Sequence, residues 1–197
     1  MKEREPQAMS AGARQAAISW TGGKDCNLAL LTAWRDPSLR VSALVVFRPQ
    51  AAVFRAHPLH IMQEQADALS LPLLHVEISG EPSYKASYVS GMRRLKEVLL
   101  VEDFPFSFYP KYQTVVGRHC WLFLKQLCYG QEQGIEVVVT GDMDLVGSMQ
   151  RNWIEECGEE CGIDAFLPLW KADRNDLLRK LLHEVRPYIF CPIERTP

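Results

Sequence analysis

The chain has 197 residues, which is enough for one ordinary globular domain with a sizeable core and short for two. Hydrophobic residues make up 47% of the chain and charged residues 23%, the balance of a soluble globular protein. Twenty-two basic residues face 24 acidic ones, so a nucleic acid such as tRNA or DNA is not favoured as the main partner.

No apolar run reaches the roughly 18 residues that a membrane helix needs, so no membrane association is expected. Residues 1–14 are polar and carry no apolar stretch like that of a secretion signal, which predicts a disordered N-terminal lead and a cytoplasmic protein. A disulfide framework is not expected in such a chain. Cys157 and Cys161 are four apart and lack further ligands at similar spacing, so they are expected to pack on one helix face.

Strand and helix patterns alternate along residues 15–197. The expected strands are Ala16–Trp20, Val41–Phe47, Leu73–Ile78, Ile135–Thr140, Phe166–Trp170 and Tyr188–Ile193. Four expected helices are Asp25–Trp34, Tyr84–Leu100, Met149–Cys161 closed by Gly162, and Asp173–Val185. A further helix is expected to begin at His57-Pro58, and its apolar stripe runs as far as Leu69. This alternation predicts a single α/β domain, with a parallel sheet covered by helices on both faces.

One stretch, Val101–Gln133, interrupts this alternation. A direct helix-to-strand connection usually takes 2–6 residues, so this longer stretch is interpreted as an insertion. Its many aromatic residues predict that it docks on the domain or on a partner. We expect irregular structure over Phe104–Tyr112 and a short helix over Trp121–Tyr129.

The segment Thr21–Cys26 joins the first expected strand to the first expected helix. Open parallel sheets bind ligands at this end of their strands. Gly22 and Gly23 let the backbone turn sharply and direct N–H groups at a phosphate, and the helix start adds its positive dipole end. Thr21 adds a hydroxyl donor. The segment therefore predicts a phosphate-binding loop.

The next two residues carry charge: Lys24 offers a cation, and Asp25 a carboxylate that could hold Mg²⁺ on the phosphates. The spacing matches neither GxxxxGK[ST] nor GxGxxG, which disfavours P-loop NTPases and dinucleotide enzymes. A plain glycine turn with a capping aspartate is the alternative, but the complete hexapeptide in this context favours phosphate binding. His57 and His60 flank a helix start near the same edge, where a solvated or capping role is the simpler interpretation.

The segment Ser19–Cys26 closely resembles the PP-loop of the N-type ATP pyrophosphatases, Ser-Gly-Gly-Lys-Asp-Ser after the first strand. Further segments resemble the diphthine–ammonia ligase family and come in that family's order. They are Gln65–Leu69 with Leu71–Leu73, Val139–Asp142 with Arg151–Glu155, and Leu167–Trp170 before Asp173, Leu177 and Leu178. The resemblance covers roughly residues 16–100 and 134–183.

This resemblance implies a Rossmann-like sheet of the HUP, or adenine nucleotide alpha hydrolase-like, class. It implies an AMP-forming amide ligase that uses ATP and Mg²⁺. The substrate would be the carboxylate of diphthine, a modified histidine on translation elongation factor 2. Ammonia would then displace AMP from the activated carboxylate and give diphthamide.

The resemblance also implies roles for individual residues. The catalytic residues would be Lys24, Asp25 and Asp142, with Asp25 as the metal ligand and Asp142 binding metal or orienting the acyl adenylate. Arg151 and Glu155, one helical turn apart, would contact substrate or simply pair with each other. The implied nucleotide-binding residues are Thr21, Gly22, Gly23, Lys24, Asp25, Cys26 and Gly141.

The chain departs from the family's pattern in three places. Thr21 and Cys26 replace the first and last serines of the loop, and a thiol is a weaker donor than a hydroxyl. The segment 101–133 has no counterpart, and the C-terminus is shortened after Ile193. Two alternatives therefore stay open: a PP-loop tRNA-modifying enzyme, and a catalytically degenerate nucleotide-binding protein.

Overall fold

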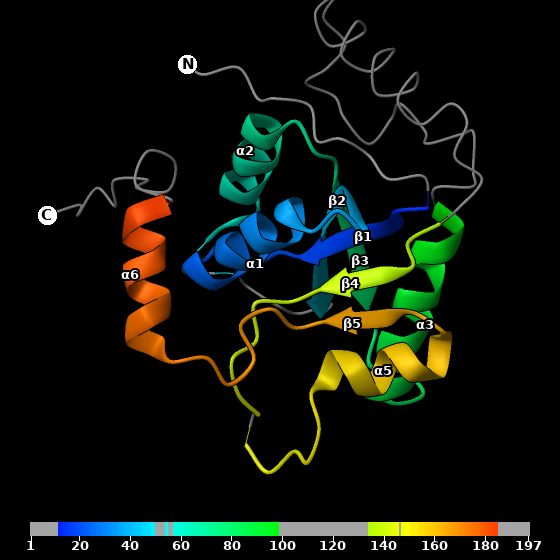
Figure 1. Ribbon diagram of the computed structural model, residues 1–197. Helices are drawn as coiled ribbons and strands as arrows, with labels where there is room; N and C mark the ends of the chain where they lie inside the picture. Colours follow the sequence, from blue (N-terminus) through cyan, green and yellow to red (C-terminus); the bar gives the residue numbers. More distant parts are fainter. Residues whose placement is uncertain (1–11, 50–53, 55–56, 99–133, 146, 185–197) are drawn as a thin grey trace, which may run out of the picture.

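The fold is built on a five-stranded, fully parallel sheet with the strand order β3-β2-β1-β4-β5 (Figure 1). The computed structural model describes residues 12–49, 54, 57–98, 134–145 and 147–184. The strands are β1 Arg14–Ser19, β2 Leu39–Pro49, β3 Leu73–Ile78, β4 Val137–Val139 and β5 Asp164–Phe166. This arrangement confirms the expected Rossmann-like α/β class.

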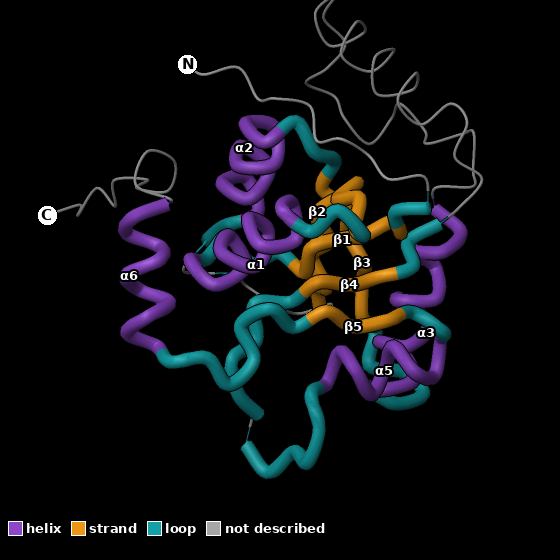
Figure 2. The backbone as a smooth tube through the Cα atoms, viewed as in Figure 1, coloured by secondary structure: helices purple, strands orange, loops and turns teal. Residues whose placement is uncertain are grey.

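Helices cover both faces of the sheet (Figures 1 and 2). Apolar side chains of α1 and α2 fill the core on one face, where two leucines of α6 pack against it. Side chains of α3 and α5 fill the core on the other face. The helices are α1 Lys24–Arg35, α2 Leu59–Leu69, α3 Tyr84–Val98, α5 Trp153–Cys161 and α6 Arg174–Glu184. None of the helices in the described ranges is long and apolar enough to cross a membrane.

The first strand lies at the centre of the sheet, as its sequence predicted. Ala16, Ala17 and Ile18 have no exposed surface, because helices cover the strand on both faces. β1 pairs in parallel with β2 on one side and with β4 on the other. Small residues at two of these positions let the flanking helices approach the sheet closely.

The chain leaves β1 and β4 toward opposite faces of the sheet. β1 leads into α1 on one face, whereas β4 leads toward α5 on the other. Neighbouring parallel strands whose connections diverge in this way form a topological switch point, and ligands of α/β proteins bind outside the carboxyl ends of such strands. The fold therefore places the Thr21–Cys26 loop at the edge where a ligand site is expected.

Several element boundaries differ from the sequence-based expectation, and the largest differences are at α5 and β5. The fourth helix was expected from Met149 but begins at Trp153, because the Asn152 side chain accepts hydrogen bonds from the first backbone N–H groups and caps the helix there. The fifth strand was expected over Phe166–Trp170 but ends at Phe166. A turn follows it, in which Lys171 has a positive φ of 54°.

Of the remaining expectations, those on α5 are confirmed and several others lie outside the described residues. Cys157 and Cys161 are both buried on α5, which confirms their packing role, and Gly162 is the C-cap of that helix with φ of 66°. The expected irregular segment Phe104–Tyr112, helix Trp121–Tyr129 and strand Tyr188–Ile193 lie outside the described residues. Residues 1–11 of the N-terminal lead, the whole of the 101–133 insertion and residues 185–197 lie outside them as well.

The described residues on either side of the 99–133 segment meet directly. The backbone N–H of Ile135 donates to the carbonyl of Leu95 at 3.3 Å. The backbone of Gly134 lies against the carbonyl of Lys96, so closely that no Cβ could be accommodated. The last turns of α3 and the entry to β4 are therefore in direct contact, although residues 99–133 lie between them in the chain.

We predict that replacing residues 101–133 by a short Gly-Ser linker leaves a soluble, folded protein. The ends to be joined are already hydrogen-bonded, and loop-closure entropy changes slowly with length. The melting temperature by circular dichroism should stay close to that of the parent. Adding Gly134→Ala to the shortened protein should lower it, because the new methyl group overlaps Lys96. A shortened chain that fails to fold would show that the segment contributes to the core.

Candidate functional site

The Thr21–Cys26 loop turns sharply at its first glycine. Gly22 is buried and has a φ of 77°, a conformation that side chains other than glycine adopt at a cost. A Cβ on Gly22 would lie 2.9 Å from both His57 Cβ and Gln65 Oε1. Gly23 is the N-cap of α1 with extended backbone, and its carbonyl accepts from Asn27. The loop therefore requires glycine at position 22 for its conformation and for its close neighbours.

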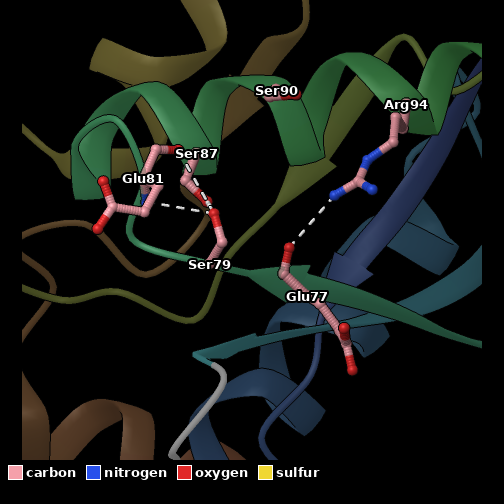
Figure 3. Close-up of a pocket in the computed structure, with 6 residues that line it drawn as sticks. All are labelled: Glu77, Ser79, Glu81, Ser87, Ser90 and Arg94. Atoms are coloured by element: carbon pink, nitrogen blue, oxygen red, sulfur yellow. Dashed lines mark hydrogen bonds between the residues drawn. The ribbon is translucent and has the colours of Figure 1, made fainter.

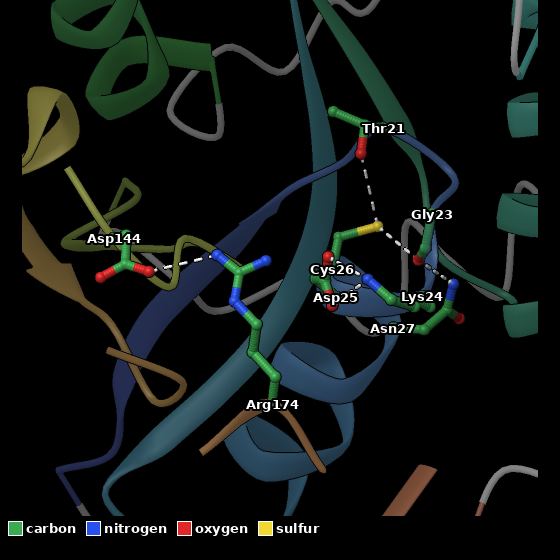
Figure 4. A network of polar contacts seen from close by, with 8 residues as sticks. All are labelled: Thr21, Gly23, Lys24, Asp25, Cys26, Asn27, Asp144 and Arg174. Atoms are coloured by element: carbon green, nitrogen blue, oxygen red, sulfur yellow. Dashed lines mark hydrogen bonds and ion pairs between the residues drawn. The ribbon is translucent and has the colours of Figure 1, made fainter. Parts of the chain in front are cut away.

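The Cys26 side chain lies inside the loop (Figure 4). Its Sγ donates to the carbonyl of Gly23 at 3.1 Å and accepts from Thr21 Oγ1 at 3.8 Å. Burial raises the pKa of this thiol, and the backbone N–H groups of Thr21, Gly22 and Gly23 partly oppose that rise. The hydroxyl of Thr21 and the carbonyl of Gly23 thus hold the sulfur inside the turn of the loop.

The two charged side chains of the loop face solvent. Lys24 Nζ lies 2.8 and 2.7 Å from the two carboxylate oxygens of Asp25. The side chains are 59% and 40% exposed, so their ion pair contributes little to stability and both groups are accessible to a ligand. Thr21 is exposed as well. The loop therefore presents a hydroxyl, an ammonium and a carboxylate on its outer side.

Gly141, directly beyond β4, brings the second half of the site against the loop. A Cβ on Gly141 would lie 2.6 Å from the carbonyl carbon of Asp25 and 2.7 Å from the backbone nitrogen of Cys26. The backbones of the β4 exit and of the first turn of α1 are therefore in contact. This places Asp142 at the same edge of the sheet as the loop, as expected. Its reach to a nucleotide stays a prediction.

Asp142 is held by Asn152, the residue that caps α5. Asn152 Oδ1 accepts from the N–H groups of Ile154 at 2.8 Å and Glu155 at 3.2 Å. This leaves the amide nitrogen to donate, and it lies 2.7 Å from Asp142 Oδ2. The half-buried carboxylate is therefore oriented toward the α5 side of the sheet, whereas the loop belongs to the α1 side.

Aromatic rings pack at the start of α5, next to the Asn152 cap. Phe47 stacks on Tyr88 with centroids 4.5 Å apart, and Trp153 meets Tyr88 edge-on at 5.6 Å and Tyr84 at 5.8 Å. Burial raises the pKa of Tyr88 well above its usual value, and the negative charge of Asp142 is among the smaller causes. Tyr88 is thus part of the core on the α3 and α5 face, with Phe47 and Trp153 packed against it.

Arg151 and Glu155 do not pair with each other, and this expectation was wrong. Arg151 forms a two-pronged ion pair with Glu159, with nitrogen-to-oxygen distances of 2.8 and 2.5 Å. Arg151 precedes the Asn152 cap, so the i,i+4 geometry of a helix does not apply to it. The structure leaves substrate contact by Arg151 or Glu155 as a prediction.

A further ion pair links the segment beyond β4 to α6. Arg174 Nη2 lies 3.2 Å from Asp144 Oδ2, and both side chains are mostly exposed (Figure 4). The backbone N–H of Lys171 also donates to the carbonyl of Met143 at 2.8 Å. The approach to α6 is therefore tied to the segment beyond β4 that carries Asp142.

A polar hollow of about 280 Å³ lies elsewhere, between β3 and α3 (Figure 3). The Ser79 and Ser87 hydroxyls are 3.1 Å apart in it, and Arg94 donates to the carbonyl of Glu77. It contains none of the residues singled out from the sequence. Within the described ranges, no group of three or more histidine, cysteine or acidic residues could hold a metal.

Gln65 and Asn152 are functional candidates that sequence reasoning did not single out. Asn152 could have been found from the preference of asparagine for helix N-caps. No local sequence preference marks the contacts of Gln65, because its hydrogen bonds with Trp20 and Gly22 join residues more than 40 positions apart.

Comparison with known proteins gives one family match. Residues 14–106 match the family model described as "Diphthamide synthase N-terminal domain". No curated protein matches the chain. A solved structure described as a predicted subunit of tRNA methyltransferase from Methanocaldococcus jannaschii is similar at 14% identity, with a TM-score of 0.44. That comparison covers 87% of this chain and 75% of the other.

We predict different costs for alanine at the two loop glycines. Gly22→Ala should lower the free energy of unfolding by roughly 2 to 4 kcal/mol, because it adds a positive-φ penalty to overlap with His57 and Gln65. A Cβ on Gly23 meets nothing closer than 3.7 Å. Gly23→Ala should cost at most about 1 kcal/mol, since alanine is the poorer N-cap. Urea unfolding followed by tryptophan fluorescence measures both. Equal losses would contradict the loop geometry.

A second prediction concerns Asn152. Asn152→Asp keeps the cap but sets a second carboxylate against Asp142, which raises the folded-state pKa of the pair above the unfolded value. The variant therefore keeps its stability at pH values below the unfolded-state pKa, and it loses stability as the pH rises through the raised folded-state pKa range. The variant should therefore lose more stability relative to the parent at pH 7 than at pH 4 in urea unfolding.

Asn152→Ser is the matched control for that experiment. Serine also caps a helix but adds no charge, so its difference from the parent should be nearly independent of pH. A pH-independent loss in Asn152→Asp would show that the Asn152–Asp142 contact is not formed in solution.

Proposed function

We propose that the chain is an AMP-forming amide ligase of the diphthine–ammonia ligase type, because residues 14–106 match the family model of the diphthamide synthase N-terminal domain, which indicates an ATP-using PP-loop enzyme. Its substrates would be ATP, ammonia and the diphthine side chain of translation elongation factor 2. The observation that carries the proposal is the glycine loop at the carboxyl end of β1, inside the matched segment, where the backbone turns at Gly22 and α1 begins at Lys24.

The reaction needs an activated carboxylate, because a carboxylate oxygen is a poor leaving group. The carboxylate oxygen attacks the α-phosphorus of ATP and forms an acyl adenylate, with release of pyrophosphate. Ammonia then attacks the acyl carbon, and AMP departs with the electrons of the broken C–O bond. The amine nitrogen loses a proton to solvent or a base. The protein has to stabilise charge on the pyrophosphate and at the acyl carbon.

The exposed groups of the loop are suited to the first of these tasks. The backbone amides around Gly22 and Gly23 and the ammonium of Lys24 would hold the β- and γ-phosphates. Asp25 is the one carboxylate of the loop, and Mg²⁺ usually binds to one or two carboxylates together with the phosphates themselves. The loop fits such an ion, which would neutralise phosphate charge when bound.

Asp142 is suited to a role nearer the acyl group. It lies beyond β4, next to the contact between Gly141 and the loop, and Asn152 holds one of its carboxylate oxygens. A fixed carboxylate at the switch point can orient the acyl adenylate or contribute a metal ligand. It would act from the opposite side of the sheet edge to Lys24 and Asp25.

ATP–pyrophosphate exchange tests this proposal. Exchange that requires elongation factor 2 bearing diphthine supports the ligase. Exchange that requires tRNA instead would support a PP-loop tRNA-modifying enzyme. Binding of ATP without any exchange would support a degenerate nucleotide-binding protein, and absence of ATP binding would refute all three.

We predict that Asp25→Asn abolishes Mg²⁺-dependent exchange and lowers the melting temperature little. The carboxylate is 40% exposed and pairs with the neighbouring, exposed Lys24, so it contributes little to packing. Asp67→Asn is the control, since Asp67 is an exposed acid on α2. Exchange retained in Asp25→Asn together with a large loss of stability would show that Asp25 is a structural cap.

A further inference from the structure

Gln65, on α2, joins two parts of the chain that flank the loop turn. Its Nε2 donates to the carbonyl of Gly22 at 3.2 Å, and its Oε1 accepts from the indole nitrogen of Trp20 at 3.1 Å. Trp20 is almost fully buried, at 1% exposure, and Gln65 is half-buried. A helix distant in sequence therefore contacts the strand end and the loop through one amide.

The orientation of that amide follows from chemistry. An indole N–H can only donate, so the atom of Gln65 that faces Trp20 has to be the carbonyl oxygen. The amide nitrogen then faces Gly22, whose carbonyl can only accept. Trp20 thus fixes which end of the Gln65 amide reaches the loop.

The same contact fixes the peptide plane between Gly22 and Gly23. A trans peptide is planar, so the carbonyl of Gly22 and the N–H of Gly23 point in opposite directions. Gln65 holds the carbonyl on the α2 side. The N–H of Gly23 is accordingly directed away from α2, at the point where α1 begins.

We propose that Gln65 is a positioning residue that fixes the Gly22–Gly23 peptide, so that the loop amides are aligned for an anionic phosphate before nucleotide binds. This role rests on the proposed use of ATP by the loop. Gly22 requires this support because its positive φ and lack of a side chain leave the peptide free to rotate. Gln65 itself touches no reacting atom in this proposal.

Gln65→Glu gives a sharp test, because its donor can be switched by pH. The ionised carboxylate still accepts from Trp20 but cannot donate to Gly22, whose carbonyl it repels. The protonated carboxyl has one O–H donor and one carbonyl acceptor, which restores both contacts. We expect the Kd for MgATP relative to the parent to be about ten-fold higher at pH 8 and to approach the parent's value near pH 4.5.

Matched controls separate this effect from general pH dependence. Both proteins carry the same charged groups near the loop, namely His57, Lys24 and Asp25, so the ratio of variant to parent at each pH removes their contribution. Gln63→Glu places the same charge two residues earlier on α2, where the Gln63 amide donates to Asp67 at the surface. The ratio of the Kd of Gln63→Glu to that of the parent should not fall toward one at low pH as it does for Gln65→Glu. A flat ratio for Gln65→Glu would overturn the proposal.

A second measurement does not depend on nucleotide. In the NMR spectrum, Gln65→Leu should shift the Trp20 indole and Gly23 amide protons and speed exchange of the indole proton with solvent. Gln63→Leu should leave both signals in place. If Gln65→Leu leaves them in place as well, Gln65 does not position the loop. If they shift but the parent binds no MgATP, the contact is correct and the proposed function is wrong.

Discussion

The contact between Gly141 and the first turn of α1 is the constraint on which the site depends. Only a residue without a Cβ lets the exit of β4 approach the backbone of Asp25 and Cys26 to this distance. Since β1 and β4 are parallel neighbours, the contact joins the two strand ends from which the chain diverges to opposite faces. The Thr21–Cys26 loop and Asp142 are thereby held at the same edge of the sheet by backbone packing.

Uncharged side chains hold the loop in shape, whereas its charged side chains are accessible to a ligand. The carbonyl groups of Gly22 and Gly23 accept hydrogen bonds from the side chains of Gln65, Cys26 and Asn27. Lys24 and Asp25 lie outside and contribute little to the fold. A ligand can therefore engage the charged groups without breaking the contacts that shape the loop, which keeps the reorganisation needed for binding small.

The two halves of the site come from different parts of the chain. The segment that matches the diphthamide synthase N-terminal domain, residues 14–106, contains β1, the loop and Gln65. Gly141, Asp142 and Asn152 lie beyond it. They reach the loop because the connection from Leu95 to Ile135 brings β4 directly to the side of β1.

The sequence by itself determined the parallel α/β fold and the loop, because both depend on local patterns. Alternating apolar runs define the strands and helices, and Thr21–Cys26 is one continuous segment. Only the tertiary structure decided the rest. The start of α5 at Trp153 depends on the Asn152 side chain, and the Arg151–Glu159 pair depends on where that helix begins. The bridge from Gln65 to Gly22 joins residues 43 positions apart, and no local pattern records a contact that forms only when the sheet and α2 pack together.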